Sequence, residues 1–231
     1  MVQVNTEKLF VRVKFKKVGN LQYISHLDLV RTMHKVIVRA RLPLWYTEGF
    51  NPKPKMIFAA PLSIGTESVC EFVDIRLTER MDPCEVVRRL NENMTGEMQA
   101  TEAYYPETKF TDLKWLSYTI RINTVGADQS LAEKCNEAIC AEKLEVLKNT
   151  KSGEAMVDIR PLVKSCNAVY DGGEIRISCI LSADPSSFLN PEYIVKILRE
   201  KCGILSCENL YAEGYSIMRE RAYDEKMNEF R

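Results

Sequence analysis

The order in which extended and helical patterns follow each other constrains the fold of this chain more than any other feature. Residues 8–18 alternate apolar and charged side chains, with the period of two of a strand that has one buried face. Ser25 then begins a helical pattern that continues to Arg41, and Ser25 and Asp28 form a capping box at its start. Four further segments complete the order β-α-β-β-α-β: strands at 56–62, 69–77 and 98–105, and a helix that starts at Asp82-Pro83. This order is the ferredoxin-like pattern, in which two helices cover one face of an antiparallel sheet.

A polar, turn-like segment at 106–112 separates this half from a second half, in which the same order of elements returns. The two halves share no residue motif, so the repeat is one of element order alone. The elements predicted in the second half are strands at 117–124, 144–149, 174–182 and 205–218 and helices at 130–143 and 190–202.

We therefore predict an α+β protein built from tandem ferredoxin-like (βαββαβ) modules with antiparallel sheets. The N-terminal domain spans 1–108 and carries a basic surface, and the C-terminal domain spans 113–223. An insertion lies near 151–172, and residues 224–231 form a polar tail. A length of 231 residues suffices for two small domains, each with its own core.

The N-terminus and the hydropathy of the chain indicate a cytoplasmic protein. Residues 1–17 carry charges throughout and lack the apolar core of a signal peptide. No segment approaches the roughly 18 to 20 apolar residues that a membrane-spanning helix needs. We therefore expect the protein to stay in the cytoplasm and to have no membrane partner.

The cysteines and histidines predict neither a metal site nor a cofactor of the chain's own. The eight cysteines are scattered without a C-x-x-C pair, which argues against a zinc ribbon or an iron–sulfur cluster, and we expect reduced, mostly buried thiols. His26 and His34 are the only histidines, although carboxylates could still bind magnesium. No phosphate-binding loop, dinucleotide-binding loop or nucleophile elbow occurs, so nucleotide hydrolysis and serine hydrolase chemistry are disfavoured.

Positive charge is concentrated in the first quarter of the chain. Residues 1–60 contain eleven Lys and Arg against three acids, a net charge of +8, whereas residues 61–231 carry −8 and the whole chain is neutral. Such a segment attracts polyanions, among which nucleic acids are the commonest in a cytoplasm. The alternative is that these charges only solvate one face or pair with acids of the second half.

The predicted helix at 25–41 carries a basic stripe. Arg31, Lys35 and Arg39 recur every four residues, and Arg41 follows them. The opposite face is apolar and is expected to pack on the sheet through Leu27, Val30, Met33, Ile37 and Ala40. Like charges at this spacing disfavour a helix slightly, and a phosphate backbone would offset that cost. We favour a polyanion-binding face over a merely solvated one.

The segment WYTEGFNPKPK at 45–55 is the second candidate for nucleic-acid binding. Prolines hold it extended, and its aromatic rings and cations suit stacked bases and phosphates together. Equally, its aromatic residues could belong to the core and its prolines could protect a sheet edge. The side chains concerned are Trp45, Tyr46, Phe50, Asn51, Lys53 and Lys55.

His26 and Tyr46 are weak candidates for catalysis. His26 lies at a helix start, where it could bind a phosphate or act as a general base on a ribose hydroxyl. However, Asp28 already offers a carboxylate to the free N–H groups there. His34 lies about 80° further around the helix, so the two histidines do not form an ideal acid–base pair. A capping or structural role is the favoured interpretation for both histidines.

In the second half, Asp158 and Arg160 precede Pro161, which is typical of the start of a short helix. This interpretation is structural. A paired role of Asp158 and Arg160 in substrate recognition is weakly signalled.

Residues 23–77 resemble the signature of the uncharacterised radical SAM-linked protein family, and VDIRPLVKS at 157–165 is similar to its second motif. The most specific positions of the first motif are Ser25, His26, Leu27, Asp28, Arg31, Gly49, Phe50, Asn51, Pro52, Pro54, Pro61, Leu62 and Gly65. In that family this domain of unknown function occurs beside or fused to a B12-binding radical SAM protein, often near a ribonuclease of the E/G type. Where the family often has a histidine after Asn-Pro, this chain has Lys53, which keeps a positive group but removes an imidazole.

The resemblance implies a radical SAM partner and no established activity of this domain. A more distant similarity, of topology and a basic helix only, is to the tandem ferredoxin-like endoribonucleases that process CRISPR repeats, and fold alone does not transfer chemistry. Three functions follow as hypotheses. The chain is an RNA-binding subunit that presents RNA to a radical SAM modifying enzyme, a metal-independent endoribonuclease that processes RNA, or a protein-interaction adaptor for a radical SAM partner that binds no RNA.

Overall fold

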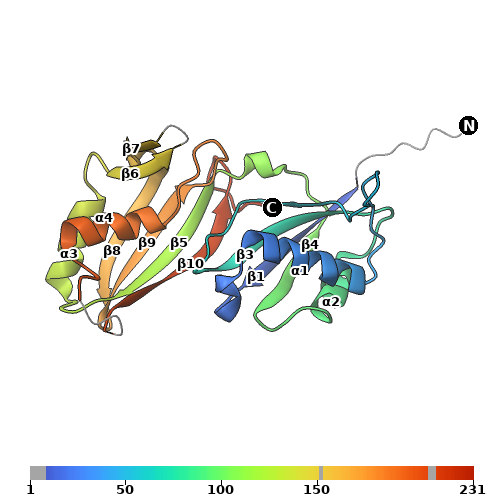
Figure 1. Cartoon of the computed structure of the whole chain (residues 1–231), viewed down its shortest axis with the longest axis horizontal. Coiled ribbons are helices and arrows are strands. Elements are labelled where there is room, and N and C mark those ends of the chain that lie inside the picture. The colour runs from blue at the N-terminus through green and yellow to red at the C-terminus, as the bar shows by residue number, and fades with distance from the viewer. Residues whose placement is uncertain (1–8, 151–152, 208–211) are drawn as a thin grey trace, which may run out of the picture. The chain divides into compact units, whose positions relative to one another are not determined.

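The structure, a computed structural model, describes residues 9–150, 153–207 and 212–231. Within these residues the chain is an α+β protein with four α-helices and mostly antiparallel β-sheet (Figure 1). It divides into two compact units, which we call unit 1 and unit 2. Unit 1 ends at Phe110 and also includes Arg231, whereas unit 2 runs from Thr111 to Phe230.

Unit 1 has the element order β-α-β-β-α-β. Its strands pair antiparallel in the order β4-β1-β3-β2, with Arg12 of β1 opposite Tyr104 of β4 on one side and Asp74 of β3 on the other. Therefore β1, the first strand among the described residues, lies inside its sheet, between β4 and β3. The elements are β1 (Phe10–Lys17), α1 (His26–Arg39), β2 (Met56–Phe58), β3 (Thr66–Arg76), α2 (Pro83–Asn91) and β4 (Met98–Tyr104).

The two helices of unit 1 pack on the same face of its sheet. Val11, Val13 and Phe15, at alternate positions of β1, are fully buried and share one hydrophobic core with both helices. The buried residues of the helices are Leu29, Met33, Val36 and Ile37 of α1 and Val86 and Leu90 of α2. The period-two pattern of β1 thus has the meaning predicted for it, a strand with one core-facing side.

The buried face of α1 differs in part from the predicted one. Met33, Ile37 and Ala40 are buried as predicted, but Leu27 is 55% exposed and Val30 is half-buried. The remaining inward positions belong to Leu29 and Val36. Both sets of residues recur at spacings of three and four, so the period of 3.6 residues fits either of them. Only packing against the sheet selects between two apolar rows that lie side by side on one helix.

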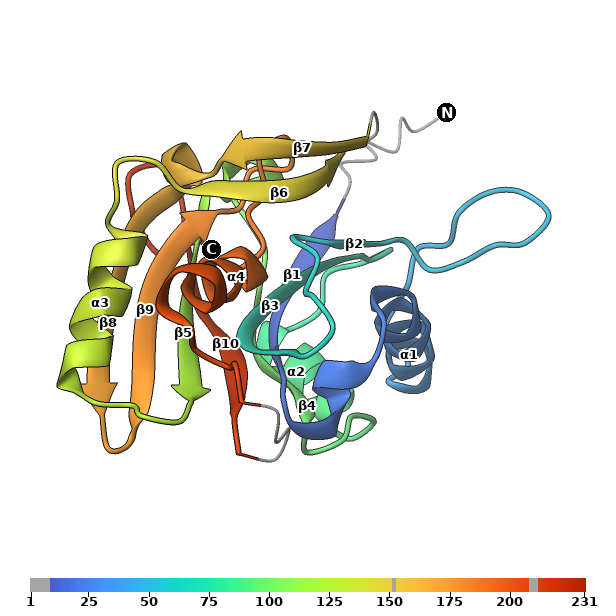
Figure 2. The same cartoon turned by 60° about the vertical axis from the view of Figure 1, so that its left-hand side comes forward.

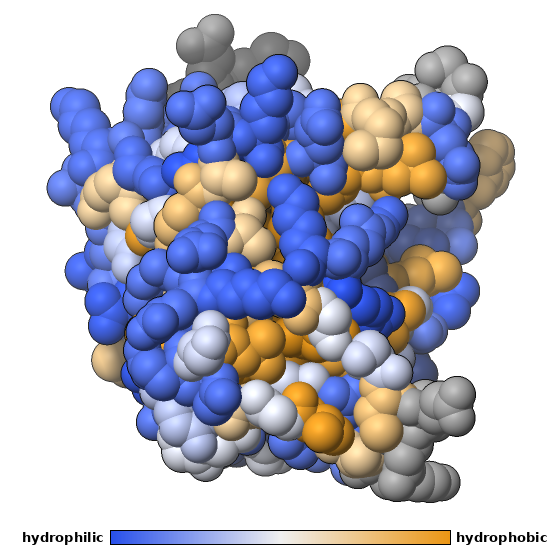
Figure 3. All heavy atoms as spheres, turned by 90° about the vertical axis from the view of Figure 1, so that its left-hand side faces the viewer, coloured by the Kyte–Doolittle hydropathy of each residue, from blue (hydrophilic) through white to orange (hydrophobic). Residues whose placement is uncertain are grey.

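Unit 2 repeats the order of core elements around an inserted hairpin. Four of its strands form an antiparallel sheet in the order β10-β5-β9-β8, and β6 pairs with β7 in a separate two-stranded sheet. The elements are β5 (Trp115–Asn123), α3 (Gln129–Ile139), β6 (Glu145–Thr150), β7 (Gly153–Asp158), β8 (Val163–Asp171), β9 (Glu174–Ser182), α4 (Glu192–Cys202) and β10 (Gly214–Tyr223). Figure 3, which views the left-hand side of Figure 1, shows polar and charged side chains that separate the hydrophobic areas of this face.

The prediction that 144–149 forms the second strand of this sheet is wrong. That segment is β6 of the hairpin, and the position beside β9 belongs to β8, which lies within the predicted insertion at 151–172. The strand β8 was not predicted because Pro161, just before its start, interrupts the sequence pattern. Pro161 lies in a single 3-10 turn, and the regular strand begins directly afterwards at Val163. Residues 151–152 of the predicted insertion lie outside the described residues.

The end of the chain also differs from the prediction. The last strand, β10, begins at Gly214 rather than at Leu205, and residues 208–211 of the predicted strand lie outside the described residues. The predicted polar tail turns back along β10, since Phe230 N donates a hydrogen bond to Ala222 O at 2.9 Å. Phe230 is only 2% exposed. A single apolar side chain near the end of a polar segment therefore anchors it.

Candidate nucleic-acid interface

Helix α1 begins with the N-cap that its sequence predicts. Ser25 Oγ accepts a hydrogen bond from Asp28 N at 3.1 Å and donates one to Asp28 Oδ2 at 2.6 Å. Asp28 Oδ1 accepts a further hydrogen bond from Arg31 Nη1 at 3.2 Å. These contacts, led by the Ser25 hydroxyl, lower the pKa of Asp28. The predicted cap is confirmed, and it holds an ionised carboxylate against the first basic residue of the helix.

Three basic side chains lie exposed on α1, and we call Arg31, Lys35 and Arg39 the basic stripe. Arg31 forms an ion pair with Asp28, but both side chains are more than half exposed, and pairs of this kind contribute little. Within the residues that the structure describes, neither the Lys35 nor the Arg39 side chain makes a hydrogen bond or an ion pair. The stripe therefore keeps most of its positive charge available for an anion.

Two other basic residues of the first quarter are buried. Arg12 is 0% exposed and donates to both carboxylate oxygens of Asp74, at 2.7 and 3.0 Å. Lys17 is 2% exposed and donates from Nζ to Leu21 O at 2.9 Å. The net charge of the segment thus overstates the charge at its surface. Exposed positive charge is concentrated on α1 and on the segment that follows it.

That segment, Trp45–Lys55, forms a loop with strand-like sides, which we call the arm. At its base, Trp45 N donates to Arg76 O at 3.0 Å and Lys55 N donates to Trp45 O at 3.1 Å. Nearer its tip, Thr47 N donates to Lys53 O at 2.9 Å. Figure 2 shows the arm as the light blue loop that extends away from the sheet between α1 and β2. Backbone hydrogen bonds between its two sides hold the arm in this extended form.

The aromatic residues of the arm differ in exposure. Trp45 is half-buried, and the Arg76 guanidinium lies 3.9 Å from the centre of its ring. Tyr46 is 44% exposed, and Phe50 near the tip is fully exposed, at 112%. The alternative that the aromatic residues of this segment belong to the core therefore fails for Phe50. Asn51, which follows Phe50, is exposed, as are Lys53 and Lys55 on the return side of the arm.

Both histidines contact the segment at 54–58. His34 Nε2 lies 3.2 Å from Pro54 O, a distance at which it donates a hydrogen bond to that carbonyl. The His26 ring meets the Phe58 ring edge to face, with the ring centres 5.4 Å apart. These contacts join α1 to the base of the arm and to β2. Their geometry is that of packing and positioning, and no hydrogen bond or ring contact joins His26 to Tyr46 among the described residues.

The other motif residues lie at turns. Gly49 has φ of +120° and Gly65 has φ of +84°, values at which a side chain would strain the backbone. Gly65 N donates to Gln22 O at 2.9 Å, which places the loop before β3 beside the segment that precedes α1. Pro52 is exposed in the arm, and the Pro54 carbonyl is the one that His34 contacts.

Asp158 and Arg160 belong to unit 2 and have structural partners there. Asp158 Oδ1 accepts hydrogen bonds from Leu144 N and Arg160 N, both at 2.9 Å, and these bonds lower its pKa. Arg160 donates to Ile139 O at 3.3 Å. Pro161 lies in the first turn of a 3-10 helix, so the predicted start of a short helix at this motif is confirmed.

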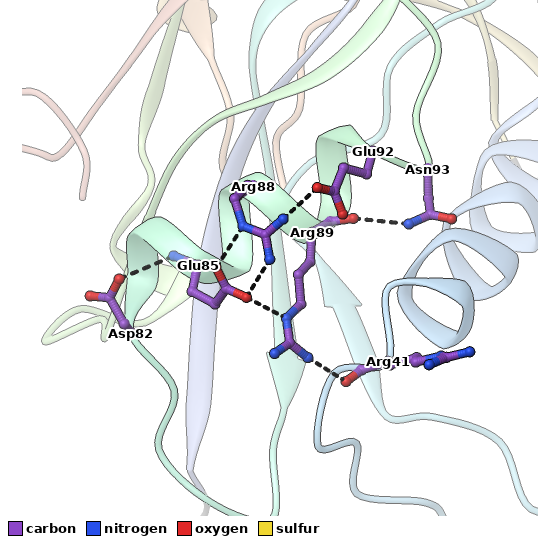
Figure 4. A network of polar contacts seen from close by, with 7 residues as sticks. All are labelled: Arg41, Asp82, Glu85, Arg88, Arg89, Glu92 and Asn93. Atoms are coloured by element: carbon purple, nitrogen blue, oxygen red, sulfur yellow. Dashed lines mark hydrogen bonds and ion pairs between the residues drawn. The ribbon is translucent and has the colours of Figure 1, made fainter.

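A polar network on α2 was missed in the sequence. Glu85 accepts hydrogen bonds from Arg88 and Arg89 at 2.7 Å, and Arg88 also pairs with Glu92 (Figure 4). The Arg88 and Arg89 contacts lower the pKa of Glu85 to about 2, and Arg89 also donates to Arg41 O at 3.1 Å. The spacing of Glu85, Arg88, Arg89 and Glu92 at three and four residues is the signal that could have predicted this network.

Residues 9–150, 153–207 and 212–231 contain no group of three or more His, Cys, Asp or Glu side chains arranged to hold a metal ion. All eight cysteines are free thiols. Among the helices in these ranges, none combines the length and the apolar character needed to cross a bilayer.

A family model described as "Uncharacterized protein conserved in bacteria (DUF2344)" matches residues 11–191 of the chain. No curated protein matches. A chain in the crystal structure of a Cbf5-Nop10-Gar1 complex is 10% identical and aligns with 94% of this chain, with a TM-score of 0.48, and this chain spans 50% of its length. An unknown protein from Galdieria sulphuraria is 10% identical over 92% of this chain and 99% of its own, with a TM-score of 0.26. At these TM-scores neither likeness supports a conclusion about fold or function.

Proposed function

The chain belongs to the family of uncharacterized proteins conserved in bacteria whose model it matches, and from that premise we propose that it is an RNA-binding accessory subunit. Its basic stripe and its arm bind the RNA, and the bound RNA is presented to a radical SAM modifying enzyme. The chain itself carries out no chemistry in this proposal. The enzyme partner enters only through the sequence resemblance, whereas RNA as the ligand is argued from the surface of unit 1.

We also propose that each unit is a ferredoxin-like module. The sheet order β4-β1-β3-β2, with both helices on one face, supports this for unit 1. The order β10-β5-β9-β8 supports it for unit 2, once the β6–β7 hairpin is treated as an insertion between α3 and β8. In a module of this class, one side of each helix packs on the sheet and the other side faces outward. In unit 1 the basic stripe lies on the outward side of α1.

The observation that carries the proposal is the absence of acidic partners for Lys35 and Arg39 within the described residues. Cations that are spaced along one helix face and lack acidic partners repel each other, and a phosphate chain removes that repulsion. RNA binding by such contacts releases condensed counterions, so the affinity depends strongly on salt. Lys53 and Lys55 extend the positive surface from α1 along the arm.

The test compares two triple variants of equal charge. In the first, Arg31, Lys35 and Arg39 are replaced by Ala. In the second, three exposed cations of unit 2 are replaced by Ala, namely Lys143, Lys201 and Arg221. RNA affinity is measured between about 50 and 200 mM salt, a range over which loss of phosphate contacts changes affinity by orders of magnitude. The stripe variant is expected to flatten the slope of log affinity against log salt by about two to three, since each lost phosphate contact removes about one.

Equal slopes for the two variants would show that net charge, rather than the basic stripe, attracts the RNA. A wild-type protein that binds its enzyme partner and no RNA would replace the proposal with the adaptor function. Cleavage of RNA has no place in the proposal, because the contacts of His26 and His34 are with Phe58 and Pro54.

A further inference from the structure

Phe50 is exposed to an unusual degree for a large apolar residue. At 112% its side chain makes no more contact than in an extended peptide. Single exposed apolar side chains are common on protein surfaces, so exposure alone has no meaning. What distinguishes Phe50 is the arm on which it stands.

The arm is held by contacts at its base and along its sides. Arg76 donates its backbone N–H to Lys55 O at 3.0 Å and stacks its guanidinium on Trp45, while His34 bonds the Pro54 carbonyl. Gly49, beside Phe50, has a φ that favours glycine, so the direction of the tip is built into the sequence. A preorganised arm loses little conformational entropy when its tip binds a ligand.

The charges beside the ring indicate the kind of ligand. The side chains of Lys53 and Lys55 are exposed at alternate positions on the return side of the arm, and neither ammonium group makes a hydrogen bond or an ion pair within the described residues. Lysine is depleted at the centres of protein–protein interfaces, which argues against a protein pocket for Phe50. An aromatic ring next to free cations is typical of surfaces that bind single-stranded nucleic acid.

We propose that Phe50 stacks on an unpaired nucleobase while Lys53 and Lys55 contact the adjacent phosphates. This inference rests on the proposed RNA-binding function and narrows its substrate class to RNA with a single-stranded loop or bulge. Bases inside a duplex are already stacked on both faces, so a ring at the tip of an arm finds no partner there. The basic stripe contacts only phosphates and accepts paired and unpaired segments alike.

The experiment uses two RNA probes of equal length and charge, a hairpin with an unpaired loop and a fully paired duplex. Binding of both probes is measured for the wild type, Phe50→Ala, Phe50→Leu and Phe50→Trp, and for the double variant Lys35→Ala/Arg39→Ala. Phe50→Ala and Phe50→Leu are expected to weaken binding of the loop probe by about 5- to 150-fold and to leave duplex binding unchanged. Phe50→Trp is expected to retain the affinity for the loop and to show quenched fluorescence when it binds.

The double variant is expected to weaken binding of both probes, which separates the two parts of the surface. If Phe50→Ala weakens both probes equally, or neither, the stacking inference is wrong while the proposed function stands. If Phe50→Leu binds the loop as the wild type does, the ring acts as an apolar anchor and the inference is again overturned. Binding of neither probe by the wild type would overturn the proposed function itself. Because Phe50 has no packing partner, none of these substitutions threatens the fold.

Discussion

Helices α1 and α2 pack on the same face of one sheet, and both expose basic residues, but they differ in what surrounds the charges. On α2, Arg88 and Arg89 share Glu85, and Arg88 also contacts Glu92. On α1, the exposed cations have one acidic partner between them, Asp28 in the first turn. The number of basic residues on a helix is therefore a poor guide to the charge that a ligand meets, and the spacing of the acids is a better one.

This difference indicates how one sheet can present two kinds of helix surface. The network on α2 neutralises its own charge and bonds to the end of the α1 segment through Arg41 O. Its arginines have acidic partners and offer little charge to a polyanion. The stripe on α1 has the opposite character, since the Lys35 and Arg39 side chains have no acidic partner among the described residues and remain available. Three predictions test this comparison.

The largest expected effect separates the buried face of α1 from its exposed face. Ile37 is fully buried in the core, and Ile37→Ala is expected to lower the free energy of unfolding by about 2–5 kcal/mol, because it removes buried methylene groups and leaves a cavity. Denaturant unfolding measures this change, with Val38→Ala, an exposed neighbour, as the control. The salt dependence of RNA binding should be unchanged in Ile37→Ala under conditions where it is folded. A change in that slope would mean that the two faces are not independent.

A smaller effect is expected when α2 is made to resemble α1. Replacing Glu85 and Glu92 by Gln removes the carboxylates that neutralise Arg88 and Arg89, and the slope of log RNA affinity against log salt should steepen by about one to two. The matched control is Glu133→Gln/Glu137→Gln on the exposed side of α3, which changes the net charge equally. If both double variants gain affinity to the same extent, pairing of the arginines does not distinguish the two helices.

The smallest effect concerns the pH dependence of stability. The pKa of Glu85 is lowered from 4.5 to about 2 by its contacts with Arg88 and Arg89, so the folded state favours the ionised carboxylate. The resulting stabilisation is present above pH 4.5 and is lost as the pH falls from 4.5 towards 2. The difference in unfolding free energy between the wild type and Glu85→Gln should therefore shrink over this window. It should also be small, because the pair is exposed to solvent, and a constant difference would show that ionisation of Glu85 is not its cause.

Much of unit 1 could be predicted because its signals are local. The cap at Ser25 and the alternation along β1 depend on neighbouring residues, and both have the predicted structure. The choice of Leu29 rather than Leu27 as an inward residue depends on packing against a sheet that is distant in sequence. The same holds for β8, whose position is set by pairing with β9 and whose start is hidden by Pro161. Non-local pairing leaves a weaker trace in a sequence than a cap or a turn does.

The candidate interface divides in the same way. The exposure of the basic stripe follows from helix periodicity and agrees with the prediction. The separation of the arm into a half-buried Trp45 and a fully exposed Phe50 does not follow from composition, because both are large aromatic residues in one short segment. This difference in exposure arises from the backbone hydrogen bond between Trp45 and Arg76 and from the turn at Gly49.

The position of β1 between β4 and β3 has a consequence for synthesis of the chain on the ribosome. Arg12 of β1 pairs with Tyr104 of β4, so the edge of β1 that faces β4 stays uncovered until β4 has been made. Until then, β1 has unpaired backbone groups along one edge and an apolar face, and both are accessible to other nascent chains. The two strands of this pair are separated in sequence by most of unit 1. Pairing of strands so far apart has a high entropic cost of loop closure and is therefore slow. The four-stranded sheet of unit 1 therefore cannot be complete before β4 has been made.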